Sequence, residues 1–202
     1  MKRRACPPVA TLALLAVVCF VYATELAGDG LAICREFGLT PSHPTVVGLF
    51  ASMVLHDPAS WQHVLGNAVM LLAAGVTVER ALGHLRLLTL FAAAGIGGAL
   101  MHVAADPTSV TPMVGSSAAV FGILASLGML YPRTVGFVAT CAAWNIWQTV
   151  TGSAGQVATA AHLGGFAMGA LLTAIVFSRQ LAEIRGWRRA PRSARAVAAA
   201  PW

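Results

Sequence analysis

The sequence predicts an all-α polytopic membrane protein that crosses the bilayer six times. Of its 202 residues, 57% are hydrophobic and only 10% are charged, and one soluble core of this size cannot bury that much apolar surface. The apolar residues gather in six runs, most of them near the length of about 20 residues that crosses about 30 Å of hydrocarbon. We therefore expect transmembrane helices at residues 9–26, 61–78, 85–103, 117–130, 134–150 and 157–177.

The distribution of basic residues predicts the orientation of these helices. Six spans place both ends of the chain on one side, and twelve of the thirteen lysines and arginines then fall on that side. They are Lys2, Arg3, Arg4, Arg80, Arg86, Arg133, Arg179, Arg185, Arg188, Arg189, Arg192 and Arg195, and only Arg35 lies opposite. Because cytoplasmic loops concentrate positive charge, we expect a multi-pass protein of the cell membrane with both termini in the cytoplasm. Topology and contact with the lipid bilayer explain the net charge of +6 without a nucleic-acid partner.

We interpret residues 1–187 as one membrane domain and residues 188–202 as a basic, disordered cytoplasmic tail. The long connection of residues 27–60 is rich in glycine and proline, but its apolar run 46–55 favours a partly helical segment at the outer membrane interface. A cleaved signal peptide is the alternative for the N-terminal segment. However, no small-x-small cleavage site follows Phe20, and removal of the first span would spoil the charge distribution.

The fourth apolar run is too short to cross the bilayer alone. Its 14 residues span about 21 Å as a helix, roughly 9 Å less than the hydrocarbon thickness. The preceding residues 106–116 contain Pro107, Pro112 and Gly115, and we expect them to enter the bilayer as irregular chain. Such backbone is tolerated at membrane depth only where protein buries it or water reaches it. The sequence thus predicts a water-accessible pocket above Ser117.

Four polar side chains reach a similar depth in the outer leaflet. Ser117 opens the fourth span, His162 lies about 7.5 Å below the start of the sixth, and Asn67 and His63 lie about 9 Å and about 3 Å below the start of the second. A neutral His162 imidazole can take the Ser117 proton during attack on an amide carbonyl and return it to the leaving amine. His63, Asn67 and the Ser117 backbone N–H would donate to the oxyanion. Phe121, four residues after Ser117, is expected to pack against His162.

Each of these residues also has a packing explanation. The segment from Gly115 to Gly122 would serve as a small-residue helix face, and His162 would be a buried hydrogen-bonding residue beside Gly165 and Gly169. His63 and Asn67 would then be interhelical hydrogen-bonding residues. A separate packing role explains each residue alone, but it does not explain why the four polar side chains lie at a similar depth.

Four short motifs follow one another along the second to sixth spans. They are His63-Val64-Leu65-Gly66-Asn67 with His56 before it, Val78-Glu79-Arg80-Ala81-Leu82-Gly83, Gly115-Ser116-Ser117-Ala118-Ala119-Val120-Phe121-Gly122, and Ala161-His162-Leu163-Gly164-Gly165 with Gly169. In these motifs and their order the chain resembles the rhomboid family of intramembrane serine proteases. The resemblance implies a rhomboid-like six-helix bundle, with Ser117 as nucleophile, His162 as general base and acid, and His63 and Asn67 as oxyanion donors. It also implies transmembrane protein substrates and no metal, nucleotide or other cofactor.

The chain departs from the family pattern at Ala118, where a glycine usually follows the nucleophile. We expect the extra methyl group either to narrow the oxyanion region or to shift substrate choice. This departure keeps open the alternative of an inactive rhomboid-like pseudoprotease that binds transmembrane helices. The expected supporting residues are Gly115, Ala118, Phe121 and Gly165.

Other membrane protease classes fit worse, because the sequence has no His-Glu-x-x-His motif and its seven carboxylates lie at span ends or outside spans. The same lack of a mid-membrane acid disfavours a proton-coupled transporter.

Overall fold

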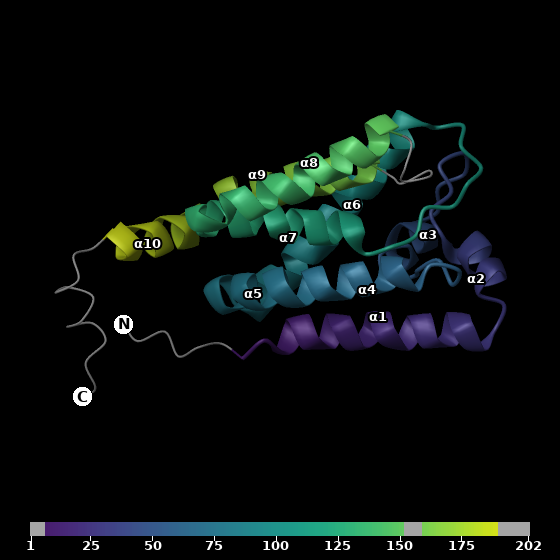
Figure 1. Ribbon diagram of the computed structural model, residues 1–202, viewed down its shortest axis with the longest axis horizontal. Coiled ribbons are helices and arrows are strands. Elements are labelled where there is room, and N and C mark those ends of the chain that lie inside the picture. The colour runs from purple at the N-terminus through teal and green to yellow at the C-terminus, as the bar shows by residue number, and fades with distance from the viewer. Residues whose placement is uncertain (1–6, 152–158, 190–202) are drawn as a thin grey trace.

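The computed structural model describes residues 7–151 and 159–189, and across them the chain is helical without a named strand. The helices are α1 (Val9–Ala27), α2 (Gly30–Phe37), α3 (Val46–Ala51), α4 (Trp61–Met70), the π-helical turn η1 (Leu71–Gly75), α5 (Val76–Leu82), α6 (His84–Ala105), α7 (Ser117–Leu130), the 3-10 turn η2 (Pro132–Thr134), α8 (Val135–Thr151), α9 (Thr159–Ile175) and α10 (Ser178–Arg189). The long helices run side by side, with α2 and α3 at one end and α10 at the other (Figure 1). The prediction of an all-helical chain is confirmed for these residues.

A helix occupies each of the predicted apolar runs, although residues 157–158 of the last run lie outside the described part of the chain. By length and composition, three described helices are able to cross a membrane: α1, the continuous segment Trp61–Leu82, and α6. The pair α9 and α10, bent by 73°, makes a fourth if it is counted as one span, and α7 is a shorter apolar helix. The described helices therefore support a membrane protein, and the count of six spans stays a prediction.

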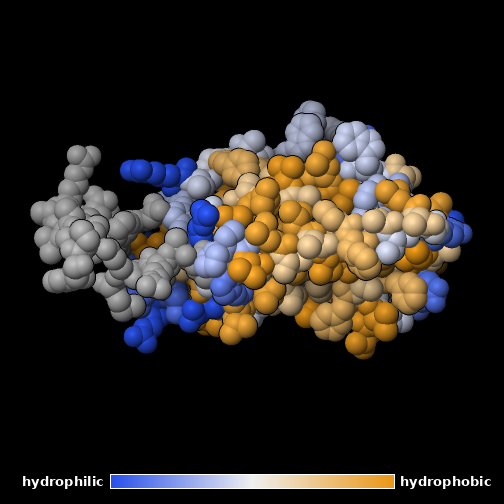
Figure 2. Space-filling model, turned by 90° about the horizontal axis from the view of Figure 1, so that it is seen from below, coloured by the Kyte–Doolittle hydropathy of each residue, from blue (hydrophilic) through white to orange (hydrophobic). Residues whose placement is uncertain are grey.

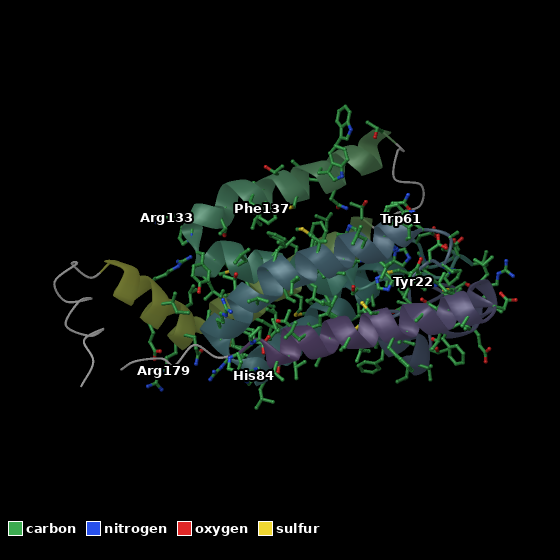
Figure 3. The ribbon with its side chains drawn as sticks, turned by 60° about the horizontal axis from the view of Figure 1, so that its bottom comes forward. Tyr22, Trp61, His84, Arg133, Phe137 and Arg179 are labelled. Atoms are coloured by element: carbon green, nitrogen blue, oxygen red, sulfur yellow. The ribbon has the colours of Figure 1, made fainter. Side chains whose placement is uncertain are left out.

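The surface has the polarity expected of a protein surrounded by lipid. Hydrophobic residues cover the middle of the face shown in Figure 2, and hydrophilic residues gather toward its ends. Large apolar side chains such as Phe20 (71% exposed) and Leu171 (52% exposed) point outward along the helices, where lipid tails would cover them. In Figure 3, Tyr22 and Trp61 lie toward one end of the molecule, and His84, Arg133 and Arg179 lie toward the other.

Glycines bring α6, α7 and α9 into backbone contact. A Cβ atom at Gly169 would lie 2.2 Å from the carbonyl oxygen of Gly122, and one at Gly164 would lie 2.6 Å from that of Gly97. Because apolar side chains gain little from leaving lipid, helices in membranes associate through close packing of such small residues. These contacts pack α9 directly against both α7 and α6.

A buried carboxylate joins α1 to the end of the second helical segment. Glu79, fully buried on α5, accepts hydrogen bonds from the backbone N–H groups of Ala10 and Thr11 at 2.7 Å each, and from the Thr11 hydroxyl at 2.5 Å. Its Oε1 also lies 2.5 Å from Nδ1 of His84. The N–H groups of a helix's first turn lack intrahelical partners, so Glu79 caps α1 from another helix.

The connection of residues 27–60 is partly helical, as predicted, and the C-terminal helix α10 extends further than expected. The segment 27–60 contains α2 and α3, and α3 exposes Val46 (74%) and Phe50 (52%), as an interfacial helix would. At the other end, α10 continues through Arg189 and so passes the predicted start of the disordered tail at residue 188. The rest of the predicted tail, residues 190–202, lies outside the described residues.

Candidate active site

Ser117 is the first residue of α7, and the preceding chain explains why the helix begins there. Residues 106–116 contain no helical segment, as predicted, and Gly115 has a φ of +123° that residues with a side chain rarely adopt. The Gly115 N–H donates to the carbonyl of Ser52 at 2.8 Å, which ties this chain to the first connection. Ser117 therefore lies at a helix N-terminus, where free N–H groups and the positive end of the helix dipole gather.

The structure brings Ser117 and His162 into direct contact. Nε2 of His162 lies 2.7 Å from Oγ of Ser117. His162, in the first turn of α9, is only 7% exposed. The ring of Phe121 stacks on the imidazole with a centroid distance of 4.5 Å and an interplanar angle of 5°. A hydroxyl, an imidazole and a ring that fixes the imidazole plane are thus assembled from α7 and α9.

His63 and Asn67 lie on the same face of α4, four residues apart, and that face meets the chain just before Ser117. A Cβ atom at Gly115 would lie 2.7 Å from Cε1 and 2.9 Å from Nε2 of His63, and 3.8 Å from Nδ2 of Asn67. Gly115 therefore leaves the room that the two side chains occupy. The side chains of His63 and Asn67 therefore lie next to Gly115, which precedes Ser117 by two residues.

His56 belongs to this polar network, a role that the sequence did not reveal beyond its place in the motif. Asn67 Nδ2 lies 3.1 Å from His56 Nε2, and His56 Nδ1 lies 3.2 Å from the carbonyl oxygen of Val54. The His56 ring also meets that of His63 edge to face at 5.3 Å. Burial, together with the nearby His63, lowers the pKa of His56 to about 4, so its ring is neutral at neutral pH. Its Nδ1–H then donates to Val54, and its Nε2 accepts from Asn67.

The backbone of this histidine is held as well. The N–H of His56 donates to Oε1 of Glu25 at 2.9 Å, and the thiol of Cys34 lies 3.3 Å from the His56 carbonyl oxygen. All three residues are buried. The first connection is therefore anchored at the point where it supports Asn67.

Asn145 of α8 is a second residue that sequence reasoning missed. Its Nδ2 lies 2.5 Å from Nδ1 of His162, and the side chain is only 4% exposed. An isolated asparagine in the apolar run 134–150 was the available signal, because a polar side chain in a span is costly without a partner. The imidazole of His162 thus has a polar partner on each of its two nitrogens.

Ala118 lies against α6. A Cβ atom at Gly98 would lie 2.5 Å from the Ala118 methyl group, so the missing side chain at position 98 provides the space that this methyl group fills. Gly165 meets the other side of the same residue, since a Cβ there would lie 2.0 Å from the Ala118 carbonyl oxygen. Two glycines therefore accommodate the residue that follows Ser117.

The described residues contain no group of three or more histidine, cysteine, aspartate or glutamate side chains that could hold a metal ion. The arrangement offers instead a hydroxyl beside an imidazole, with polar side chains and a helix N-terminus next to the hydroxyl. These parts suit acyl transfer through a serine nucleophile.

Comparison with known proteins shows the family of the chain. Residues 43–179 match the family model of the Rhomboid domain. The chain belongs to the rhomboid family. The matched range contains Ser117, His162, His63, Asn67 and Asn145, so the whole polar site of this rhomboid lies inside the family domain.

Curated relatives come from Arabidopsis thaliana. RHOMBOID-like protein 5 is 24% identical over 162 residues, which cover 70% of this chain and 52% of the relative. RHOMBOID-like protein 1 is 28% identical over 143 residues (61% and 36%), and RHOMBOID-like protein 4 is 30% identical over 124 residues (58% and 31%). The alignments thus span about half or less of the length of these relatives.

Proposed function

We propose that this rhomboid is an intramembrane serine endopeptidase that cleaves peptide bonds in or near transmembrane segments of other membrane proteins. The observation that carries the proposal is the 2.7 Å contact between Ser117 Oγ and His162 Nε2 at the N-terminus of α7. No metal, nucleotide or nucleic acid has a part in it. The lipid bilayer and the transmembrane substrate are the partners.

In the proposed reaction, Ser117 Oγ attacks the scissile carbonyl carbon while His162 Nε2 takes the hydroxyl proton. The carbonyl oxygen becomes an oxyanion. The backbone N–H of Ser117 and the side chains of His63 and Asn67 donate hydrogen bonds to it. When the tetrahedral intermediate collapses, the C–N bond breaks and the His162 proton passes to the leaving amine. Water then attacks the carbonyl carbon of the acyl-serine ester, and His162 takes a proton from it. The bond between this carbon and Ser117 Oγ breaks, His162 returns the proton to Oγ, and the carboxylic acid product leaves.

The supporting contacts favour a preformed site. Phe121 fixes the plane of the His162 ring, and His56 accepts one N–H of the Asn67 amide, which leaves the second N–H of that amide for the oxyanion. Gly115 and Gly165 allow the close approach of α4 and α9 to the start of α7. Groups held in this way need little reorganisation during the reaction.

The proposed setting is the cell membrane, with six spans and both termini in the cytoplasm. The start of α1 and the whole of α10 lie at one end of the helix bundle, opposite α2 and α3 (Figure 1). Arg133 and Arg179 lie toward that same end (Figure 3). This arrangement supports the orientation that the positive-inside rule predicts.

Labelling with a fluorophosphonate tests the proposal, since this reagent reacts with an activated serine. Wild-type protein in mild detergent should be labelled, whereas Ser117→Ala and His162→Ala should not. Ser126→Ala is the matched control, because Ser126 lies on the same helix with its hydroxyl 2.5 Å from that of Thr173, and its labelling should equal that of wild type.

Folded wild-type protein that neither takes the label nor cleaves a transmembrane substrate in liposomes would identify an inactive helix-binding pseudoprotease. Trapping with Ser117→Ala followed by mass spectrometry would then identify substrates or partners.

A further inference from the structure

The side chain of Asn145 turns inward from a helix whose neighbouring residues turn outward. Trp144, Ile146 and Trp147 of α8 are 61%, 50% and 59% exposed, whereas Asn145 is buried against His162. An amide that faces lipid would lose its hydrogen bonds, so its burial needs a polar partner. One partner that the structure provides is Nδ1 of His162, the imidazole nitrogen that does not contact Ser117.

The orientation of the Asn145 amide determines which nitrogen of His162 carries the proton. In the structure the amide NH2 group faces Nδ1. In that orientation it donates to this nitrogen, and the single proton of the neutral ring must lie on Nε2. Nε2–H would then donate to Ser117 Oγ, and it could not accept the serine proton. When the amide is turned by 180° so that Oδ1 faces the ring, Nδ1–H donates to it and the Nε2 lone pair faces the Ser117 hydroxyl.

We propose that Asn145 is a positioning residue that holds His162 in the base-competent tautomer by accepting Nδ1–H with its amide oxygen. The inference rests on the proposed protease function. Asn145 touches neither the substrate nor Ser117 in this scheme and acts only through the imidazole. Once Nε2 has taken the serine proton, Nδ1–H continues to donate to Oδ1, so the ring keeps its orientation until it returns the proton to the leaving amine.

The position of Asn145 in the fold suits this role. Phe121 of α7 stacks on one face of the imidazole, but stacking leaves the ring free to turn within its own plane. A hydrogen bond at Nδ1 from α8 stops that rotation and selects the tautomer in one contact. The polar contacts therefore run from Ser117 on α7 through His162 on α9 to Asn145 on α8. The third residue of this chain of contacts is uncharged.

Three variants test this inference in liposomes with a transmembrane substrate. Asn145→Ala should lower kcat by about 10-fold to 100-fold, as loss of a partner that orients a histidine does elsewhere, while KM stays unchanged. Asn145→Asp keeps an oxygen acceptor at the same place and should recover most of the lost kcat. Thr140→Val, which removes an exposed hydroxyl that is bonded within the same helix, should behave like wild type.

A spectroscopic readout on the wild-type protein makes the test independent of turnover. The ¹⁵N chemical shifts of His162, assigned by comparison with His162→Ala, should show a protonated Nδ1 and an unprotonated Nε2. An Nε2-protonated ring would overturn the inference, as would an Asn145→Ala variant with wild-type kcat. Equal losses in Asn145→Ala and Asn145→Asp, with equal falls in thermal stability, would assign Asn145 a structural role only. Failure of the proposed function has a different signature, because wild-type protein would then remain unlabelled by fluorophosphonate.

Discussion

The carbonyl oxygen of Ala118 lies in the space that a side chain at Gly165 would occupy, 2.0 Å from an ideal Cβ atom at that position. Ala118 follows the proposed nucleophile by one residue, and Gly165 follows the proposed base by three. The helices that carry the two reactive groups therefore touch backbone to backbone beside the site. This close packing sets the distance between Ser117 and His162.

Substitution Gly165→Ala should consequently separate the two groups. Two heavy atoms that are not bonded to each other do not tolerate a separation of 2.0 Å, and the Ala118 carbonyl is rigid backbone, so α9 must move away from α7. We expect a loss of about 1–3 kcal/mol in the free energy of unfolding, as for other overpacked sites. A displacement of about 1 Å should lower kcat about 100-fold. Cleavage kinetics and thermal unfolding in detergent measure the two effects.

Gly136→Ala is the control for this change, because a Cβ atom at Gly136 in α8 would meet nothing within 4 Å. It should leave kcat unchanged and should not lower stability, since alanine is the better helix former. Wild-type kcat in a folded Gly165→Ala variant would show that the approach of α9 does not position the base.

The stack of Phe121 on His162 predicts a smaller effect on the chemical step. Phe121→Leu keeps an apolar side chain but removes the flat face that lies 4.5 Å from the imidazole centroid. Such ring pairs contribute about 0.5–1.5 kcal/mol, which corresponds to a loss of about 2-fold to 12-fold in kcat. Phe91→Leu, at a buried position in the core, should reduce stability without this loss. If both variants retain wild-type kcat, the stack does not orient the base.

The contact between Ala118 and Gly98 predicts that the methyl group serves packing. Ala118→Gly should reduce the free energy of unfolding by about 1 kcal/mol, because a buried methyl group is lost and glycine is less helix-prone. The oxyanion donors should be unaffected, and kcat should stay near the wild-type value. A large rise in kcat would instead show that the methyl group narrows the oxyanion region, one of the effects expected from the sequence.

His56 predicts an acid-sensitive fold. Its pKa is lowered from 6.5 to about 4 by burial and by His63, so between these values the unfolded chain binds a proton that the folded chain does not. Stability should therefore fall as the pH is lowered from about 7 to about 4, by up to about 3 kcal/mol from this residue. His56→Gln should flatten that slope, whereas His43→Gln, at an exposed position, should leave it unchanged. Parallel slopes in all three proteins would show that another group is responsible.

The sequence predicts the helical framework of this rhomboid well because apolar length and motif order are local properties. The predicted fourth span and α7 have the same bounds, residues 117–130. The depth argument also selected Ser117 and His162, which the structure joins at 2.7 Å. Helix rise along one axis is enough for such an estimate, since it needs no knowledge of which faces pack together.

The rest of the polar site depends on tertiary contacts that periodicity does not encode. His56 lies in a connection, and its contact with Asn67 exists only because that connection folds back against α4. Asn145 is a single polar residue in an apolar run, and its partner on α9 follows from the lateral order of the helices. The neighbour of the Ala118 methyl group, Gly98 of α6, likewise follows from how the helices pack.

The cap that Glu79 places on α1 predicts a stability defect far from the reactive groups. Glu79→Gln keeps the size of the side chain but replaces one acceptor oxygen with an NH2 group, which cannot accept from Ala10 or Thr11. Because a buried donor is then left without its charged acceptor, we expect a loss of about 2–3 kcal/mol in the free energy of unfolding. Thr11→Val, which removes only the hydroxyl contact, should lose less. Glu183→Gln is the control, since its contact with Arg179 is exposed and 3.6 Å long, and such pairs contribute little. Denaturant titration in mixed micelles measures all three, and equal stability of Glu79→Gln and Glu183→Gln would refute the capping role.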